Sequence, residues 1–301
     1  MTPFSEVSII VVRELRKSFR SVKGILLLVF TVLGGGLLAY LLAQSDDVRR
    51  RQLDVKGISP EAVLAAKQEG LSWWFTSVET GHHVGKAPFL LMVLFAVSLW
   101  LVPAVVLILG FDTVSGDLQH RTLRYWSIRT RRASYVTGKF LGLWATCSIV
   151  ALAMHMLIWV IVIARGEATF AETVSWGVRF WLASLPILSM WCGLSVLVSS
   201  FFRLPILALL LTGGAFFMWW LLNAAFWSGP HLDALAQAKD APGASMVIPA
   251  ASTMMFLYPN FYDRFLLSPL FSQTMIGLVV TLGFAALCTA GGSFIILKRD
   301  V

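Results

Sequence analysis

Charged residues are scarce in this sequence. Asp, Glu, Lys and Arg make up only 13% of the 301 residues, whereas hydrophobic residues make up 57%. A soluble domain carries about 25% charged and about 45–50% apolar residues. This composition excludes an ordinary soluble protein and predicts an integral membrane protein.

Six long runs of the sequence contain no Asp, Glu, Lys or Arg at all. An apolar run of about 20 residues can cross the hydrocarbon core as a helix, because the backbone in lipid must satisfy its own hydrogen bonds. Barrel strands would instead alternate over segments of about 10 residues. We therefore predict an all-α membrane protein, a single transmembrane domain over 1–301, with spans within 24–43, 87–111, 140–164, 180–202, 204–227 and 269–297.

Sequence motifs for catalysis are also missing. A phosphate loop needs G-x-x-x-x-G-K-[ST], but no hydroxyl residue follows either Gly-Lys pair of the chain, Gly85-Lys86-Ala87 or Gly138-Lys139-Phe140. The three cysteines lie in three different predicted spans, which indicates neither a disulfide framework nor a zinc site. We expect no catalytic, cofactor-binding or metal-binding residue in this chain, and hence no enzyme.

A dense basic segment lies between the second and third predicted spans. It runs from Phe111 to Phe140 as FDTVSGDLQHRTLRYWSIRTRRASYVTGKF, with six basic and two acidic residues. Its loop, 112–139, is longer than a tight helix connection needs, and it mixes large apolar residues with the charges. This pattern predicts a short helix with an exposed apolar edge, which would need a partner. The alternative is a loop that only follows the bias of basic residues toward the cytoplasm.

The N-terminal residues 4–23 show a similar mixture. Apolar residues recur every three or four positions, at Phe4, Val7, Val11, Leu15, Phe19 and Val22, and most charges lie off that stripe. The pattern predicts a basic amphipathic helix on the inner membrane surface. A cytoplasmic extension of the first span is the alternative.

The distribution of Lys and Arg near the spans predicts the orientation. With the N-terminus inside, the inner segments carry fourteen basic residues and the outer segments ten, six of them in the long loop 44–86. Both termini and the loop 112–139 are then cytoplasmic, in the cell (cytoplasmic or inner) membrane. The outer loops 44–86 and 228–268 are expected to be partly helical, the first beginning a helix at Ser59-Pro60-Glu61 and ending it at Gly70.

Polar residues within the spans are few. His155, Asn223, Ser189 and Ser195 are candidates either for a transport pathway or for hydrogen bonding and close packing between helices.

The layout resembles the permease subunit of an ABC transporter of the ABC-2 type. The resemblance rests on Phe111-Asp112, Ser115-Gly116-Asp117, Thr122-Leu123, Arg131-Arg132 and Gly138-Lys139, with Asp117 in place of the usual Glu and Arg121 where Gly often stands. It implies a cytoplasmic coupling helix that docks on an ATPase through residues Asp112, Ser115, Gly116, Asp117, Leu118, Arg121, Thr122, Leu123 and Trp126. We expect Asp117 to be solvated before docking.

The resemblance also implies partners. Two ABC ATPase subunits would bind ATP and magnesium. A second six-span subunit, identical or homologous, would complete the pathway. Membrane lipid would surround the complex, and no nucleic acid is expected as a partner. Export is the expected direction. The alternatives are a membrane assembly factor or membrane enzyme that uses the basic loop for other docking, and a secondary transporter. The sparse polar residues of the spans, none of them acidic, favour neither an active site nor an ion-coupling site.

Overall fold

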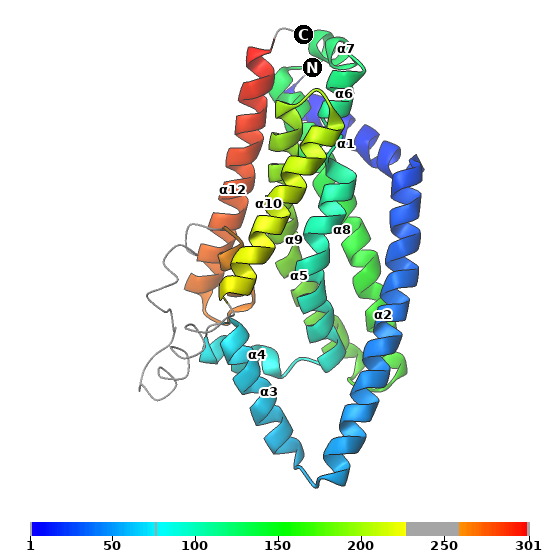
Figure 1. Ribbon diagram of the computed structural model, residues 1–301, viewed down its shortest axis with the longest axis vertical. Helices are drawn as coiled ribbons and strands as arrows, with labels where there is room; N and C mark the ends of the chain where they lie inside the picture. The colour runs from blue at the N-terminus through cyan, green and yellow to red at the C-terminus, as the bar shows by residue number, and fades with distance from the viewer. Residues whose placement is uncertain (1, 76, 227–258, 300–301) are drawn as a thin grey trace.

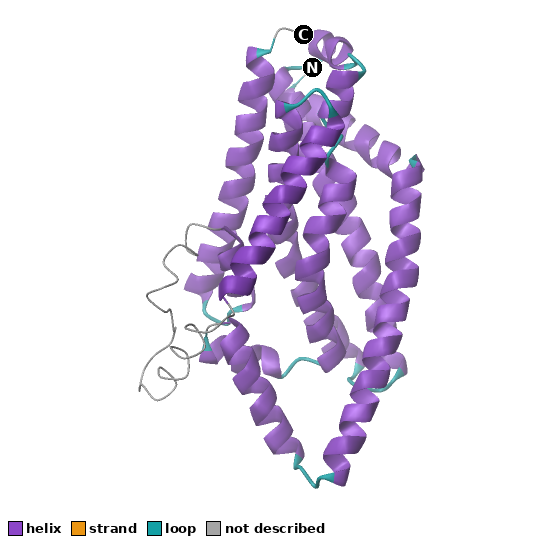
Figure 2. Ribbon diagram, in the orientation of Figure 1, coloured by secondary structure: helices purple, strands orange, loops and turns teal. Residues whose placement is uncertain are grey.

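The computed structural model describes residues 2–75, 77–226 and 259–299, and all of its regular elements there are helices (Figure 1; Figure 2). Their bounds are α1 Pro3–Arg20, α2 Val22–Val55, α3 Pro60–Phe75, α4 Val78–Gly85, α5 Phe89–Gly110, α6 Ser115–Gln119, α7 Leu123–Arg129, α8 Arg132–Ala164, α9 Phe170–Phe201, α10 Pro205–Phe226, the 3-10 helix η2 Pro259–Leu267, and α12 Phe271–Lys298.

Six of the described helices are long and apolar enough to cross a membrane, which confirms the predicted all-α fold with six spans. They are α2, α5, α8, α9, α10 and α12. Three of them extend well beyond the uncharged runs. α2 continues to Val55 and α9 begins at Phe170. α8 begins at Arg132, about two turns before the predicted start at residue 140. The extension of α8 matters because it places Tyr135 and Lys139 inside a regular helix.

The centre of the bundle is α9, which packs against α5, α8, α10 and α12. Small residues bring its neighbours close. A Cβ atom added to Gly193 would lie 2.9 Å from the backbone of Ala285 in α12, and one added to Gly110 of α5 would lie 2.4 Å from Ser195 Oγ. Close approach between backbones is how helices gain packing energy in lipid, where burial alone provides little.

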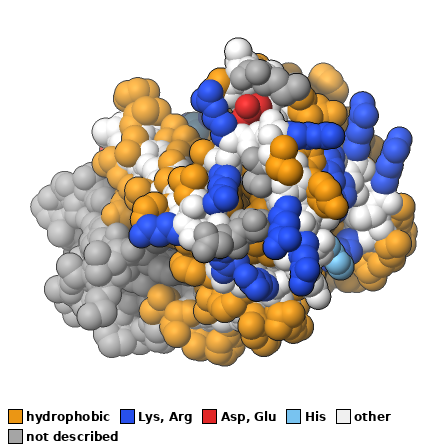
Figure 3. Space-filling model, turned by 90° about the horizontal axis from the view of Figure 1, so that it is seen from above, with side chains coloured by type: hydrophobic (Ala, Val, Ile, Leu, Met, Phe, Trp, Pro, Cys, Tyr) orange, Lys and Arg blue, Asp and Glu red, His pale blue; other side chains and the backbone are white. Residues whose placement is uncertain are grey.

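At one end of the bundle lie α1, α6, α7, the turn between α9 and α10, and the end of α12 (Figure 1). We call this the basic end. Seen from above, its face is covered by Lys and Arg side chains and shows little acidic surface (Figure 3). The opposite end, with α3, α4 and η2, is called the far end.

The far end contains the first long loop. As predicted, 44–86 is partly helical, and α3 begins at Pro60. The predicted stop at Gly70 is wrong, because α3 continues to Phe75. Glycine within a helix costs about 1 kcal/mol, but Leu71, Trp74 and Phe75 pack into the hydrophobic core and offset that cost. Of the second loop, 228–268, most lies outside the described residues, and Pro259–Leu267 forms η2.

The N-terminal helix α1 packs along α8. Its buried residues are Glu6, Ile10 and Glu14, which repeat every four positions and so share one face. Two glycines of α8 receive this face. A Cβ atom at Gly138 would lie 2.7 Å from Ile10 Cβ, and one at Gly142 would lie 2.6 Å from Glu14 Cβ. The two helices therefore touch without intervening side chains from α8.

This contact predicts that Gly138→Ala destabilises the protein. The added methyl group would push Ile10 outward, and overpacking of this kind costs about 1–3 kcal/mol. Gly283→Ala in α12 is the matched control, because nothing lies within 4 Å of its added Cβ and alanine favours the helix. Thermal unfolding in detergent should show a lower midpoint for Gly138→Ala only. Equal midpoints for the two variants would mean that the close α1–α8 contact does not exist.

Candidate functional site

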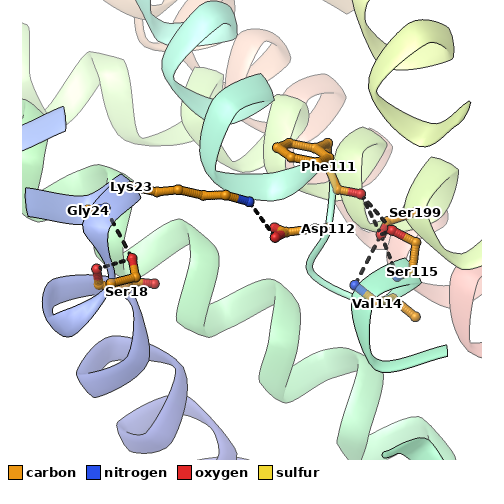
Figure 4. Close-up of polar contacts among 9 residues, drawn as sticks. Ser18, Lys23, Gly24, Phe111, Asp112, Val114, Ser115 and Ser199 are labelled. Carbon is orange, nitrogen blue, oxygen red and sulfur yellow. Dashed lines mark hydrogen bonds and ion pairs between the residues drawn. The ribbon is translucent and has the colours of Figure 1, made fainter. Parts of the chain in front are cut away.

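The turn that enters the basic segment is organised by one serine of α9. Ser199 Oγ accepts hydrogen bonds from the backbone N–H groups of Val114 and Ser115 at 3.0 and 2.9 Å, and donates to the carbonyl of Phe111 at 3.0 Å (Figure 4). Ser115 Oγ also donates to the Phe111 carbonyl. The start of α6 is thereby attached to the central helix of the bundle. Ser199 itself is fully buried.

The core of the site is a buried ion cluster. Lys139 Nζ lies 2.8 Å from Glu14 Oε1 and 2.7 Å from Asp117 Oδ2, and the Tyr135 hydroxyl donates to Asp117 Oδ2 at 2.6 Å. Lys139 and Tyr135 are each only 1% exposed. An ammonium group removed from water is costly unless it is paired and hydrogen-bonded. Glu14 on α1 and Asp117 on α6 supply that pairing, so three helices share one cation.

Two further contacts hold α1 against the basic segment. Glu6 Oε2 accepts a hydrogen bond from the backbone N–H of Arg131, the residue that caps the start of α8. This bond, with a second one from Ser134, lowers the pKa of Glu6 below its usual value. Farther along α1, the Arg13 guanidinium lies 4.4 Å from the centre of the Trp126 ring in α7, a cation–π contact.

Arg132 attaches the same segment to the end of α12. Its guanidinium donates to the carbonyl oxygens of Ile296, Leu297 and Arg299 at 2.9–3.1 Å. The last carbonyl groups of a helix have no partner within the helix, and a basic side chain there satisfies them. The adjacent residues Arg131 and Arg132 therefore link α1, α8 and α12.

The predicted docking residues fall into two groups. Ser115, Asp117 and Leu123 are buried, whereas Gly116, Leu118, Thr122 and Trp126 are half-buried and Arg121 is exposed. Asp112 is partly exposed and pairs with Lys23 of α2 (Figure 4). The expectation that Asp117 is solvated is wrong, because the buried Lys139 requires this carboxylate inside the bundle.

Arg121 has an unusual backbone conformation. Its φ is +57°, the only positive value among non-glycine residues in the described part of the chain. This left-handed conformation costs a residue with a side chain about 1 kcal/mol or more, which explains why glycine suits the position in the family that the sequence resembles.

Exposed apolar and basic groups lie on the outer side of the segment. Tyr125 and Ile128 of α7 are 74% and 83% exposed. A cleft of about 370 Å³ lies at the start of α7, and it is lined by Arg121, Arg124, Arg203 and Arg299 together with Leu118, Gln119, Leu123 and Leu204. No described carboxylate lines this cleft.

The polar residues predicted within the spans lie apart from this cluster. His155 and Ser195 are buried, and in the described residues neither the His155 ring nor Ser195 Oγ has a hydrogen-bond partner. Ser189 donates to the Pro186 carbonyl within α9. Asn223 belongs to α10, and its side chain lies outside the described residues. No group of three or more His, Cys, Asp or Glu side chains that could hold a metal occurs in the described part.

Sequence reasoning missed Glu14, Lys139 and Ser199 as site residues. A signal was present for two of them. Glu6, Ile10 and Glu14 repeat every four residues, as do Tyr135 and Lys139, so each set shares one face of a helix. The prediction for α1 rested on its apolar stripe and not on its acidic residues, and Lys139 was interpreted as the residue before a span.

These features define a multi-pass helical membrane protein whose basic segment, between the second and third spans, is tied into the bundle by buried charges. A comparison with family models finds one described as "ABC-2 family transporter protein", which matches residues 8–300. The chain therefore belongs to the ABC-2 family of transporters, as a permease. A search of curated proteins finds no match.

The ion cluster predicts a large effect for Lys139→Met. This change leaves Glu14 and Asp117 buried without their cation, and breaking a buried ion pair costs about 3–5 kcal/mol. Thermal unfolding at pH 7 should show a marked loss of stability.

Two variants complete the test. Lys23→Met removes a lysine from the half-exposed pair with Asp112 and should cost about 0–1 kcal/mol. The triple variant Glu14→Gln, Asp117→Asn, Lys139→Met has no unpaired charge and should regain most of the stability. If Lys139→Met behaved like Lys23→Met, the cluster would not be buried as described.

Proposed function

We propose that this permease forms half of a translocation pathway, and that a separate ATPase subunit docks on its basic segment to drive export. Two features of the basic segment together support the proposal. Its helix α7 exposes an apolar edge, Tyr125 and Ile128, and the segment itself is attached rigidly to the spans. An exposed apolar edge next to a basic cleft is the kind of surface that receives a partner.

The attachment gives a route for mechanical coupling. A movement of α6 pulls on Asp117, and through Lys139 on both α1 and α8. The same movement acts on α9 through the hydrogen bonds of Ser199. ATP binding and hydrolysis in a partner can shift the spans only if the contact differs between two packed states. A segment held by buried ion pairs transmits such a difference, because a loose loop would absorb it.

The arginine cleft indicates the chemistry of the partner surface. Four arginine residues line one cavity, and repulsion between two of them shows in the pKa of Arg299, which burial and the charge of Arg203 both lower. Arginine forms paired hydrogen bonds with carboxylates. We expect Asp or Glu side chains of the ATPase to enter this cleft while apolar residues cover Tyr125 and Ile128.

The charge distribution supports a cytoplasmic location for the basic end. Many Lys and Arg side chains and few acidic ones are visible on that face (Figure 3), as expected for the inner side of a cell membrane. Both termini would then be cytoplasmic, and the far end with α3, α4 and η2 would lie outside. α1 would lie along the inner membrane surface, where its exposed Phe4, Ile9 and Val12 meet lipid.

Two helices supply surface for a second permease subunit. Only 11% of the apolar window of α2 and 17% of that of α10 is buried within the chain, compared with 78% for α9. Lipid or a second six-span subunit must cover the rest. We propose that two permease subunits and two ATPase subunits form the working complex, with ATP and magnesium bound in the ATPases.

The docking proposal predicts that Ile128→Asp releases the ATPase. Its side chain is exposed in the permease, so the change leaves the fold intact, but the new carboxylate must be desolvated in the interface. Co-purification of tagged permease with the ATPase should fall at least tenfold, as for the loss of a central contact worth about 2 kcal/mol. Arg203→Glu should have a smaller effect, because exposed charge pairs contribute about 0–1 kcal/mol.

Lys56→Glu is the matched control, since Lys56 is an exposed cation at the far end. It should leave binding unchanged. The intact complex should hydrolyse ATP, and native mass spectrometry should find two permease and two ATPase subunits. Full retention of the ATPase by both docking variants would show that α7 and the cleft are only a basic loop.

A further inference from the structure

The junction between α1 and α2 is a tight elbow. Ser21 ends α1. Its backbone N–H donates to the Lys17 and Ser18 carbonyl oxygens, and its Oγ accepts from the N–H of Gly24. A Cβ atom at Gly24 would lie only 1.8 Å from the Ser18 carbonyl oxygen. The elbow is therefore a defined structure with room for glycine only, and it fixes the positions of the side chains around it.

A cavity of about 320 Å³ opens at this elbow, between α1, α2 and the ends of α5 and α8. Lys17, Ser18, Lys23 and Asp112 line it on the polar side, and Leu109 and Leu143 on the apolar side. Its volume lies in the range of small-ligand sites, about 300–1,000 Å³. Apolar walls with a few convergent polar groups are typical of such sites.

The exposed charges around the cavity are mainly cations. Lys17 and Lys23 are exposed, whereas Glu14, which also lines the cavity, is buried against Lys139. Lys23 pairs with Asp112. Lys17 makes no hydrogen bond or ion pair with the described residues, and its charge acts on Asp117 from a distance. Arg20, in the last turn of α1, adds a further exposed positive charge beside the elbow. An anionic group that approaches the open side of the cavity would meet these cations first.

The surface next to the cavity is apolar. Val22, Ile25 and Leu26, in the first turn and a half of α2, are 74%, 52% and 50% exposed. α2 begins its apolar span there, so the cavity lies at the level where a membrane changes from headgroups to acyl chains. A ligand with an anionic head and a hydrocarbon tail fits both surfaces at once.

We propose that this cavity binds the headgroup of an anionic phospholipid. Lys17 and Lys23 would hold the phosphate, the Ser18 hydroxyl would donate to it, and the acyl chains would lie along Val22 and Leu26. Basic pockets between transmembrane helices bind acidic lipid headgroups in this way. The phosphate would compete with Asp112 for Lys23. Since Asp112 precedes α6 by three residues, lipid occupancy would act on the start of the basic segment.

Lipid titration followed by native mass spectrometry tests this proposal. The purified permease should retain phosphatidylglycerol in preference to phosphatidylcholine. Lys17→Gln should weaken phosphatidylglycerol binding about fivefold, and the double variant Lys17→Gln, Lys23→Gln about thirtyfold, because each surface lysine contributes about 1 kcal/mol to binding acidic lipid. Lys17→Gln breaks no described hydrogen bond or ion pair and removes only a long-range attraction to Asp117, so its thermal unfolding midpoint should change little.

Arg16→Gln is the matched control, because it removes a neighbouring exposed charge of α1 that does not line the cavity. It should bind phosphatidylglycerol like the parent. An equal loss in Arg16→Gln would show a diffuse basic surface and overturn the proposal, as would unchanged binding in the double variant. Inorganic phosphate is the third arm: if it displaced phosphatidylglycerol fully at millimolar concentration, the cavity would be a site for free phosphate and not for lipid.

Discussion

The basic end of this protein depends on one buried ammonium group. Lys139 is almost completely removed from water, and its two carboxylate partners come from α1 and α6, elements that are far apart in the sequence. A buried cation without partners would cost several kcal/mol. The bundle therefore cannot keep Lys139 inside α8 unless both helices are in place. The main effect of this cluster is to fix the position of the basic segment, more than to stabilise the fold.

The other contacts of the basic end also join separate helices. Glu6 binds the start of α8, Arg132 binds the end of α12, and Ser199 binds the turn into α6. Each of these bonds joins a helix end to a neighbouring helix. The outer face of α7 is left with exposed apolar and basic groups, and α2 and α10 are left with exposed apolar surface. These two places are where the proposed ATPase and the proposed second permease subunit would bind.

The fold was predictable from the sequence, because uncharged runs of about 20 residues have few other uses. The site was predictable only in part. The motif residues from Asp112 to Trp126 drew attention to the segment that contains Asp117, and their role in docking stays a prediction. The direction in which Asp117 faces depends on Lys139, which lies 22 positions later and was interpreted as the end of a loop. Helix α8 extends past its apolar run because buried partners compensate the charge, and such compensation comes from tertiary contacts. The left-handed backbone conformation of Arg121 likewise could not be predicted, because it depends on the turn between α6 and α7.

Hydrogen exchange is the most direct test of the claim that Lys139 joins α1 and α6 into one unit. Amide exchange would be followed by mass spectrometry in the parent protein and in Lys139→Met, with peptides covering α1, α6 and α3. If the account is correct, α1 and α6 lose protection together in the variant, while α3, which lies at the far end and packs against α4 and η2, is unchanged. Loss of protection in α6 with α1 unaffected, or in neither helix, would contradict it.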